Sequence, residues 1–185
     1  MGRLLLSLVL LALAACQAAP SGEEASAREA FDASDYRLAS GDEVRVSVFG
    51  EPDLSAVVKV DGRGEVTLPL VGAVKADALT GAELGKAVTA ALKEGYLRDP
   101  RVTVEVTAYR PYFILGEVER PGTYPYQNGL TVLNAVATAE GFTYRANERV
   151  VFIRRDGEDE ERRFTLDSTT PVRPGDTIRI GERFL

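Results

Sequence analysis

The chain has 185 residues with 28 acidic and 22 basic side chains, which give it a formal net charge of −6. Clustered basic residues, which mark nucleic-acid binding, are not seen, so we expect no nucleic-acid partner. The sequence contains no histidine and a single cysteine, Cys16. This composition excludes the commonest zinc sites, a Ser-His-Asp triad and an internal disulfide. We expect no cofactor, no metal site and no catalytic residues, and the length suits one or two small domains.

The first fifteen residues have the organisation of a secretory signal peptide. Arg3 precedes an apolar run over residues 4–13, and two small residues stand before Cys16. A run of this length falls short of the roughly 20 apolar residues that cross a bilayer, so we predict cleavage rather than anchoring. Removal of residues 1–15 takes away Arg3 and no acid, which leaves a mature chain with a formal charge of −7.

The four residues ending at Cys16 resemble the bacterial lipobox. That resemblance implies that Cys16 receives a diacylglycerol, becomes the first mature residue and is acylated on its amine, which gives a firm anchor through several chains. Gln17 stands where an aspartate would retain the protein in the inner membrane, so the outer membrane is favoured. The alternative is an ordinary signal peptide with Cys16 as a free thiol. Residues 16–34 are predicted to be the acylated N-terminus and a flexible tether.

The first folded domain is predicted over residues 35–108. Thr80 begins a helix, because Glu83 stands three residues on as its capping-box partner and apolar residues follow on one face. Gly95 ends this helix. A hairpin turn between two strands is expected at residues 61–64, and residues 69–72 are expected to interrupt the sheet. Alternating apolar residues predict four strands, at residues 44–48, 57–60, 65–68 and 102–106.

The second domain is predicted over residues 109–185. Thr131 is expected to cap a helix whose Leu133, Val136 and Ala137 face inward and which stops at Gly141. A charged loop occupies residues 156–161. Strands are expected at residues 112–118, 150–153 and 163–166, with a last one inside residues 172–180. Each domain combines strands with one packed helix, so the predicted fold class is α+β, with two small mixed α/β domains.

Two acidic residues occupy the same local pattern in the two domains. Asp42 follows Gly41 and Asp176 follows Gly175, each just before an alternating strand. A side-chain oxygen in this position can cap a turn, and we expect that role for both. The echo between the two segments does not by itself establish a duplication.

Aromatic residues and two arginines are the candidate contacts of the second domain. Tyrosine rings can stack on sugar rings and donate a hydrogen bond, and arginine binds carboxylates bidentately. The alternative is that the tyrosines pack at a domain or subunit interface. The candidate saccharide or subunit contacts are Tyr109, Arg110, Tyr112, Tyr124, Tyr126, Tyr144 and Arg145.

Taken in order, the motifs resemble those of the Wza-like outer-membrane polysaccharide export lipoproteins. The polysaccharide export domain is matched by the residues at 36–38, 41–50, 54–55, 62–64, 68–72 and 99–102. A soluble-ligand-binding (SLBB) β-grasp domain is matched by those at 113–118, 121–124, 129–132, 135–137, 141–143, 172–178 and 182–185. The resemblance covers nearly the whole mature chain and implies a β-grasp fold for its second domain.

The resemblance also implies a function and a set of partners. Such proteins form homo-oligomeric rings at the periplasmic face of the outer membrane and carry capsular polysaccharide or exopolysaccharide outward, in line with an inner-membrane copolymerase. We expect a lipid anchor and no enzymatic activity. The sequence ends at Leu185 without an amphipathic helix that could line a pore, so a separate outer-membrane β-barrel is an expected partner. The alternative is a monomeric periplasmic lipoprotein that binds a soluble saccharide or a peptidoglycan fragment.

Overall fold

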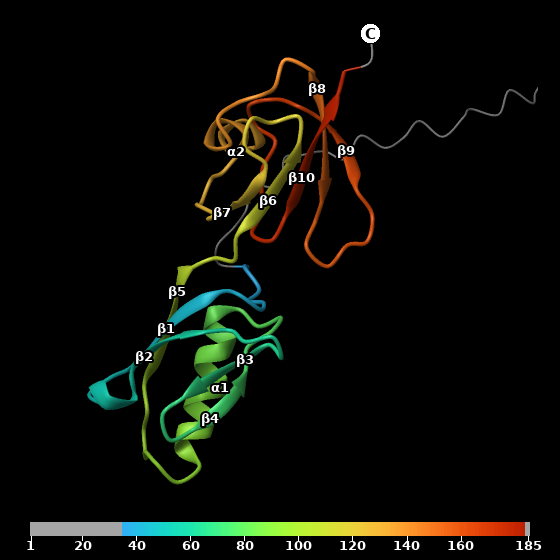
Figure 1. The fold of residues 1–185 in the computed structure, drawn as a ribbon. Helices are drawn as coiled ribbons and strands as arrows, with labels where there is room; N and C mark the ends of the chain where they lie inside the picture. The colour runs from blue at the N-terminus through green and yellow to red at the C-terminus, as the bar shows by residue number, and fades with distance from the viewer. Residues whose placement is uncertain (1–34, 184–185) are drawn as a thin grey trace, which may run out of the picture.

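The computed structural model describes residues 35–183, which form two lobes joined by one extended segment (Figure 1). Each lobe buries its own set of apolar side chains. Val44, Val46 and Leu84 belong to the first core, and Ile114 and Ile178 belong to the second. The lobes follow one another in the sequence, and residues 109–111 lie where they meet.

The first lobe contains a three-stranded antiparallel sheet, a two-stranded hairpin and one long helix. The strand order in the larger sheet is β2-β1-β5, and β3 pairs with β4. The strands alternate as predicted: Val44, Val46 and Val48 are buried while Arg45 and Ser47 are exposed. The elements are β1 (Glu43–Val48), η1 (Pro52–Leu54), β2 (Ala56–Lys59), β3 (Glu65–Leu68), β4 (Gly72–Lys75), α1 (Gly81–Lys93) and β5 (Val102–Ala108).

The predicted helix boundaries are confirmed. The Thr80 hydroxyl accepts a hydrogen bond from the backbone N–H of Glu83, and the Glu83 carboxylate accepts one from the backbone N–H of Thr80 at 2.8 Å, which completes the capping box. The helix buries Leu84, Val88 and Leu92. These positions repeat every four residues, so α1 covers the sheet with one continuous apolar stripe.

The prediction for residues 61–75 was wrong in two respects. The turn at residues 61–64 forms, but it does not join a hairpin, because β2 pairs with β1 while β3 pairs with β4. Residues 69–72 do not end the sheet. They form the turn of the β3–β4 hairpin, with Leu70 and Gly72 at positive φ. Strand β4 was missed because its four residues include only one large apolar side chain, Val74, so no alternation is visible.

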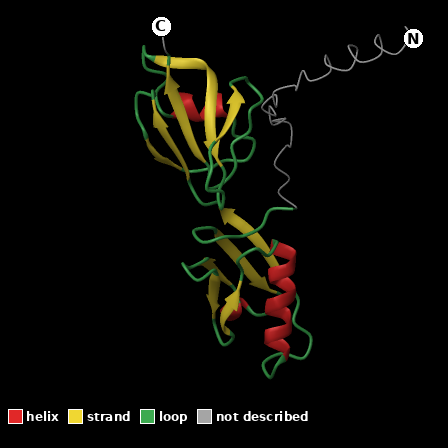
Figure 2. Cartoon of the chain, turned by 90° about the vertical axis from the view of Figure 1, so that its right-hand side faces the viewer, coloured by secondary structure: helices red, strands yellow, loops and turns green. Residues whose placement is uncertain are grey.

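The second lobe is a five-stranded mixed sheet with one short helix against it. The strand order is β7-β6-β10-β8-β9, and the central pair β6 and β10 is parallel. Figure 2 shows α2 behind the strands of this sheet. The elements are β6 (Tyr112–Gly116), β7 (Gly122–Tyr124), α2 (Val132–Thr138), β8 (Ala146–Arg154), β9 (Arg162–Thr165) and β10 (Thr177–Glu182).

Thr131 caps α2 as predicted, but the buried face of this helix differs from the prediction. Val136 is buried, as expected, whereas Leu133 is 36% exposed and Ala137 is exposed. The buried partners of Val136 are Val132 and Ala135. The backbone N–H of Val132 donates to the carbonyl of Thr170 at 2.9 Å, which holds the first turn against the chain before β10 and turns Val132 inward.

The fold class is α+β, as the combination of strands with one packed helix in each domain predicted. Within residues 35–183, no helix is both long enough and apolar enough to cross a membrane. Cys16, the signal peptide and the tether lie outside the described residues, so acylation stays a prediction.

Candidate functional site

The first lobe presents a tight turn beside the junction, built around a buried acid. Asp42 is fully buried, and its Oδ2 accepts a hydrogen bond from the backbone N–H of Ala39 at 2.9 Å. The backbone N–H of Asp42 donates to the carbonyl of Ala39 at 3.1 Å. Gly41, at φ +99°, supplies the left-handed backbone before the acid. The predicted turn-capping role of Asp42 is confirmed.

The second lobe presents the same turn. Asp176 is 1% exposed, and its Oδ2 accepts from the backbone N–H of Arg173 at 2.7 Å. Its own backbone N–H donates to the carbonyl of Arg173 at 3.2 Å, and Gly175 has φ +83°. Asp176 forms an ion pair with Arg155. The predicted turn-capping role of Asp176 is confirmed, and the echo between the two segments extends to their hydrogen bonds.

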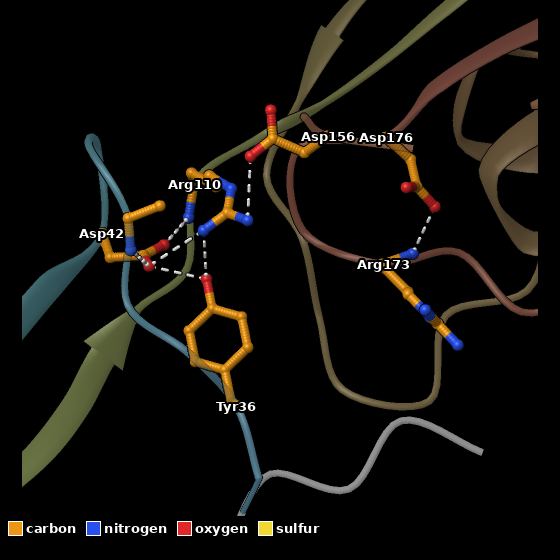
Figure 3. Close-up of polar contacts among 7 residues, drawn as sticks. Tyr36, Asp42, Arg110, Asp156, Arg173 and Asp176 are labelled. Carbon is orange, nitrogen blue, oxygen red and sulfur yellow. Dashed lines mark hydrogen bonds and ion pairs between the residues drawn. The ribbon is translucent and has the colours of Figure 1, made fainter. Parts of the chain in front are cut away.

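Arg110 connects the two lobes at this point (Figure 3). Its backbone N–H donates to Asp42 Oδ1 at 2.7 Å, and its Nη1 contacts Asp42 Oδ2 at 3.2 Å. Nη1 also donates to the Tyr36 hydroxyl at 2.8 Å, and that hydroxyl donates to Asp42 Oδ2 at 2.6 Å. On the other side, Nη2 lies 3.0 Å from Asp156 Oδ2 in the second lobe. We call Tyr36, Asp42, Arg110 and Asp156 the Arg110 clasp.

The clasp leaves no room for a side chain at Gly175. A Cβ at this position would lie 2.7 Å from Nε of Arg110 and 2.9 Å from Cβ of Asp156. Residue 175 therefore has to be glycine for two reasons, its positive φ and the close approach of the guanidinium. The Gly-Asp turn of the second lobe forms one wall of the junction, and that of the first lobe forms another.

Three tyrosine rings continue the connection from one core to the other. Tyr36 and Tyr109 pack edge to face with ring centroids 4.9 Å apart, and Tyr109 and Tyr126 do the same at 5.4 Å. Tyr109 is half-buried and packs against both hydrophobic cores. Edge-to-face pairs of this kind add about 0.5–1.5 kcal/mol each beyond the area that they bury. The junction is therefore packed as well as hydrogen-bonded.

Burial sets the protonation of the groups around the junction. It raises the pKa of Tyr36 far above its ordinary value, with a further contribution from the adjacent Asp42, and it raises the pKa of Tyr126 to about 12. Both hydroxyls are therefore neutral donors at physiological pH. Burial also raises the pKa of Asp176 to about 6, although Arg155 and the Arg173 N–H act in the opposite direction. Among the described residues, no donor reaches Asp176 Oδ1.

These two lobes correspond to two known domain families. Residues 31–107 match the polysaccharide biosynthesis/export protein family, and residues 111–164 match the SLBB domain. The chain carries a domain of the polysaccharide export family, followed by an SLBB domain. The clasp thus lies between a polysaccharide export domain and an SLBB domain, and Arg110 stands in the short connection between the two matched regions.

Two curated relatives share this region. The exopolysaccharide production protein ExoF of Rhizobium meliloti (strain 1021) is 37% identical over 143 residues, which are 71% of this chain and 32% of the relative. The polysialic acid transport protein KpsD of Escherichia coli is 26% identical over 159 residues, 80% of this chain and 28% of the relative. The chain spans about a third of the length of these curated relatives.

The structure separates the tyrosines that the sequence had grouped. Tyr109 and Tyr126 join the junction, as described above. Tyr112 is 1% exposed and stacks on Tyr124 with centroids 5.9 Å apart, inside the SLBB domain. The Tyr124 hydroxyl donates to the carbonyl of Arg120 at 2.8 Å. Packing within the chain is therefore the observed environment of these four rings.

Tyr144 and Arg145 lie apart from the junction. Tyr144 is 83% exposed, and Arg145 forms an ion pair with Glu182 near the end of β10. Tyr144 is the tyrosine of the predicted set whose ring is open to a partner. Its role as a saccharide or subunit contact stays a prediction.

Sequence reasoning missed most of the clasp. Tyr36 was part of the family resemblance only, and Asp156 was assigned to a charged loop. Arg110 was selected for binding a ligand carboxylate, but the structure pairs it with two carboxylates of the chain itself. No local pattern reveals these pairs, because Asp42 and Asp156 stand 68 and 46 positions from Arg110 in the sequence.

Proposed function

We propose that this chain is a periplasmic, outer-membrane-anchored component of a capsular polysaccharide or exopolysaccharide export complex, in which copies of the chain form a ring that conducts the polymer without covalent chemistry. The observation that carries the proposal is the joining of a polysaccharide export domain to an SLBB domain through the buried Arg110 clasp. The names of the two relatives, an exopolysaccharide production protein and a polysialic acid transport protein, support the same class of substrate.

The clasp supports assembly because a closed ring requires every copy to have the same shape. A head-to-tail contact generates a closed ring only when the rotation between neighbours is constant. The buried Asp42 holds Arg110 on the first domain, and Nη2 of Arg110 reaches Asp156 of the second domain at 3.0 Å. A change in the angle between the domains would therefore break the Arg110–Asp156 ion pair and separate the packed rings of Tyr109 and Tyr126. The angle between the domains is therefore held by the same contacts in each copy.

The sheets offer edges where copies could meet. In the first domain β2 and β5 are the outer strands, and in the second β7 and β9 are. Outer strands carry backbone N–H and C=O groups that face away from the sheet and can pair with another chain. Such edges suit a heterologous interface, since an outer strand of one copy can lie against a different element of the next.

The remaining parts of the proposal concern the envelope. Acylation of Cys16 would place the two domains below the outer membrane, and an inner-membrane copolymerase would deliver the polymer to the ring. A separate outer-membrane β-barrel would complete the passage. These partners follow from the family and not from the described geometry.

The test combines a cellular and a physical measurement. Deletion of the gene should abolish surface or secreted polysaccharide, and the wild-type gene should restore it. Sedimentation of the purified mature chain should show a large homo-oligomer. The Arg110→Ala variant should assemble poorly and restore less export, whereas Arg120→Ala, which removes an exposed ion pair with Glu140, should behave as wild type. Unchanged polysaccharide in the deletion strain, or a monomer at every concentration that binds a small saccharide, would overturn the proposal in favour of a periplasmic binding protein.

A further inference from the structure

The five-stranded sheet of the SLBB domain has one face covered by α2 and one open face, which is toward the viewer in Figure 2. Strand register places side chains of four neighbouring strands in a row across the open face. Leu115 lies opposite Arg179, Arg179 opposite Phe152, and Phe152 opposite Arg163. We call this set, together with Arg154, the open sheet face.

A flat aromatic ring lies at the centre of this face. The guanidinium carbon of Arg179 is 4.1 Å from the centroid of the Phe152 ring. Gly181 lies at the ring edge, where an added Cβ would be 3.5 Å from a Phe152 ring carbon. Phe152, Arg163, Arg179 and Gly181 line a shallow hollow of about 400 Å³. Ligand sites span about 300–1,000 Å³, so the hollow has room for a short saccharide segment.

The open sheet face is basic although the whole chain is acidic. It carries Arg154, Arg163 and Arg179 against one acid, Glu161, whose Oε2 lies 2.9 Å from Nε of Arg179. Among the described residues, Arg163 has no carboxylate within ion-pair distance, and Arg154 donates to the Thr177 hydroxyl at 3.2 Å. At least one guanidinium is therefore available to an anionic ligand.

The acids around this face are largely occupied. In the adjoining loop, Asp156 pairs with Arg110 and Glu158 pairs with Arg162. Asp159 and Glu160 of the same loop have no such ion pair among the described residues. Glu182, at the far rim of the hollow, pairs with Arg145. At the centre of the face Glu161 offsets the charge of Arg179, whereas Arg163 keeps its charge because it has no ion pair among the described residues.

We propose that the open sheet face binds acidic saccharide units, with a sugar carboxylate on Arg163 and the sugar ring in the hollow beside the stacked Phe152 and Arg179 side chains. The inference rests on the proposed export function and names the substrate class of that function as an anionic polysaccharide. Guanidinium groups bind carboxylates through paired N–H donors, and the exposed Arg163 can make such a pair without first breaking an ion pair of the protein. Because the contact is shallow, each site holds its sugar weakly and a long polymer can move from copy to copy.

The test is a titration of the isotope-labelled mature chain, followed by NMR, with two oligosaccharides of equal length. Oligogalacturonate is the acidic probe and maltooligosaccharide is the neutral one. We expect oligogalacturonate to shift the amide signals of β8, β9 and β10, and Arg163→Gln to weaken its binding at least fivefold. Arg45→Gln is the matched control, since Arg45 is an exposed arginine on the sheet of the other domain, and it should leave binding unchanged. A rise in salt from 50 to 500 mM should weaken binding of the acidic probe.

Several outcomes would overturn the inference. Equal binding of the two probes, or no binding of oligogalacturonate, would show that the face does not select carboxylates. A loss of binding in Arg45→Gln as large as that in Arg163→Gln would show general electrostatic attraction. If Arg163→Gln lowers the oligomer mass while leaving saccharide binding intact, the face is a subunit interface. None of these results touches the deletion phenotype, so failure of this inference is distinguishable from failure of the export function.

Discussion

Replacement of Arg110 by alanine tests the central feature of the fold. The change removes the guanidinium that contacts Asp42, Tyr36 and Asp156, while the backbone N–H of residue 110 still donates to Asp42 Oδ1 at 2.7 Å. Asp42 would then be a fully buried carboxylate without its cation. Breaking a buried ion pair by removing one partner costs about 3–5 kcal/mol.

The expected loss lies below that range because Asp42 keeps other donors. The Tyr36 hydroxyl at 2.6 Å and the Ala39 N–H at 2.9 Å still satisfy its Oδ2. Each hydrogen bond to a charged group contributes about 1.5–3 kcal/mol. We therefore expect Arg110→Ala to lower the free energy of unfolding by about 2–3 kcal/mol.

Urea denaturation followed by far-UV circular dichroism measures this loss. The variant should also unfold less cooperatively, because the two hydrophobic cores lose their main polar connection, and solution scattering should show a broader distribution of domain separations. Arg120→Ala is the control, since the exposed ion pair of Arg120 with Glu140 contributes about 0–1 kcal/mol. If Arg110→Ala unfolds within 0.5 kcal/mol of the Arg120→Ala control, the clasp does not hold the domains and the reasoning above is wrong.

Three further changes test the local structure. Gly175→Ala should destabilise the protein by more than Gly157→Ala. Both positions have positive φ (+83° and +78°), but only the Cβ at residue 175 would collide with the clasp. Calorimetric melting compares the stability of the two variants, and equal losses of stability would contradict the close approach at residue 175. Burial raises the pKa of Asp176 from 3.8 in the unfolded chain to about 6, so the folded protein favours the protonated carboxyl. The contribution of Asp176 to the free energy of unfolding is therefore present at low pH and is lost as pH rises through 6, by about 1 kcal/mol between pH 5 and 7. Denaturation curves across this window should show that decline, and Asp176→Asn should flatten it. Thr80→Ala should cost about 1 kcal/mol in urea denaturation through loss of the α1 capping box, and a loss below 0.3 kcal/mol would show that the box does not stabilise the helix.

Much of the secondary structure could be predicted because its signals are local. Thr80 and Glu83 identify the start of α1 within four residues, and the alternation around Val46 identifies β1. The turns at Asp42 and Asp176 were visible as Gly-Asp pairs. Strand β4 could not be recognised from the sequence, because a strand held by its hairpin partner needs no apolar alternation of its own. The buried face of α2 was assigned wrongly because a hydrogen bond to Thr170, distant in the sequence, orients its first turn.

The sequence by itself determined the order of the two domains, their α+β class and their resemblance to the polysaccharide export family, since periodicity, caps and motif spacing are properties of neighbouring residues. Only the tertiary structure decided which charges meet. It paired Arg110 with acids of both domains, buried Tyr112 in the SLBB core, and brought Phe152, Arg163 and Arg179 into one row from three different strands. Such groupings depend on strand order and register, which bring together residues that no short stretch of the chain contains.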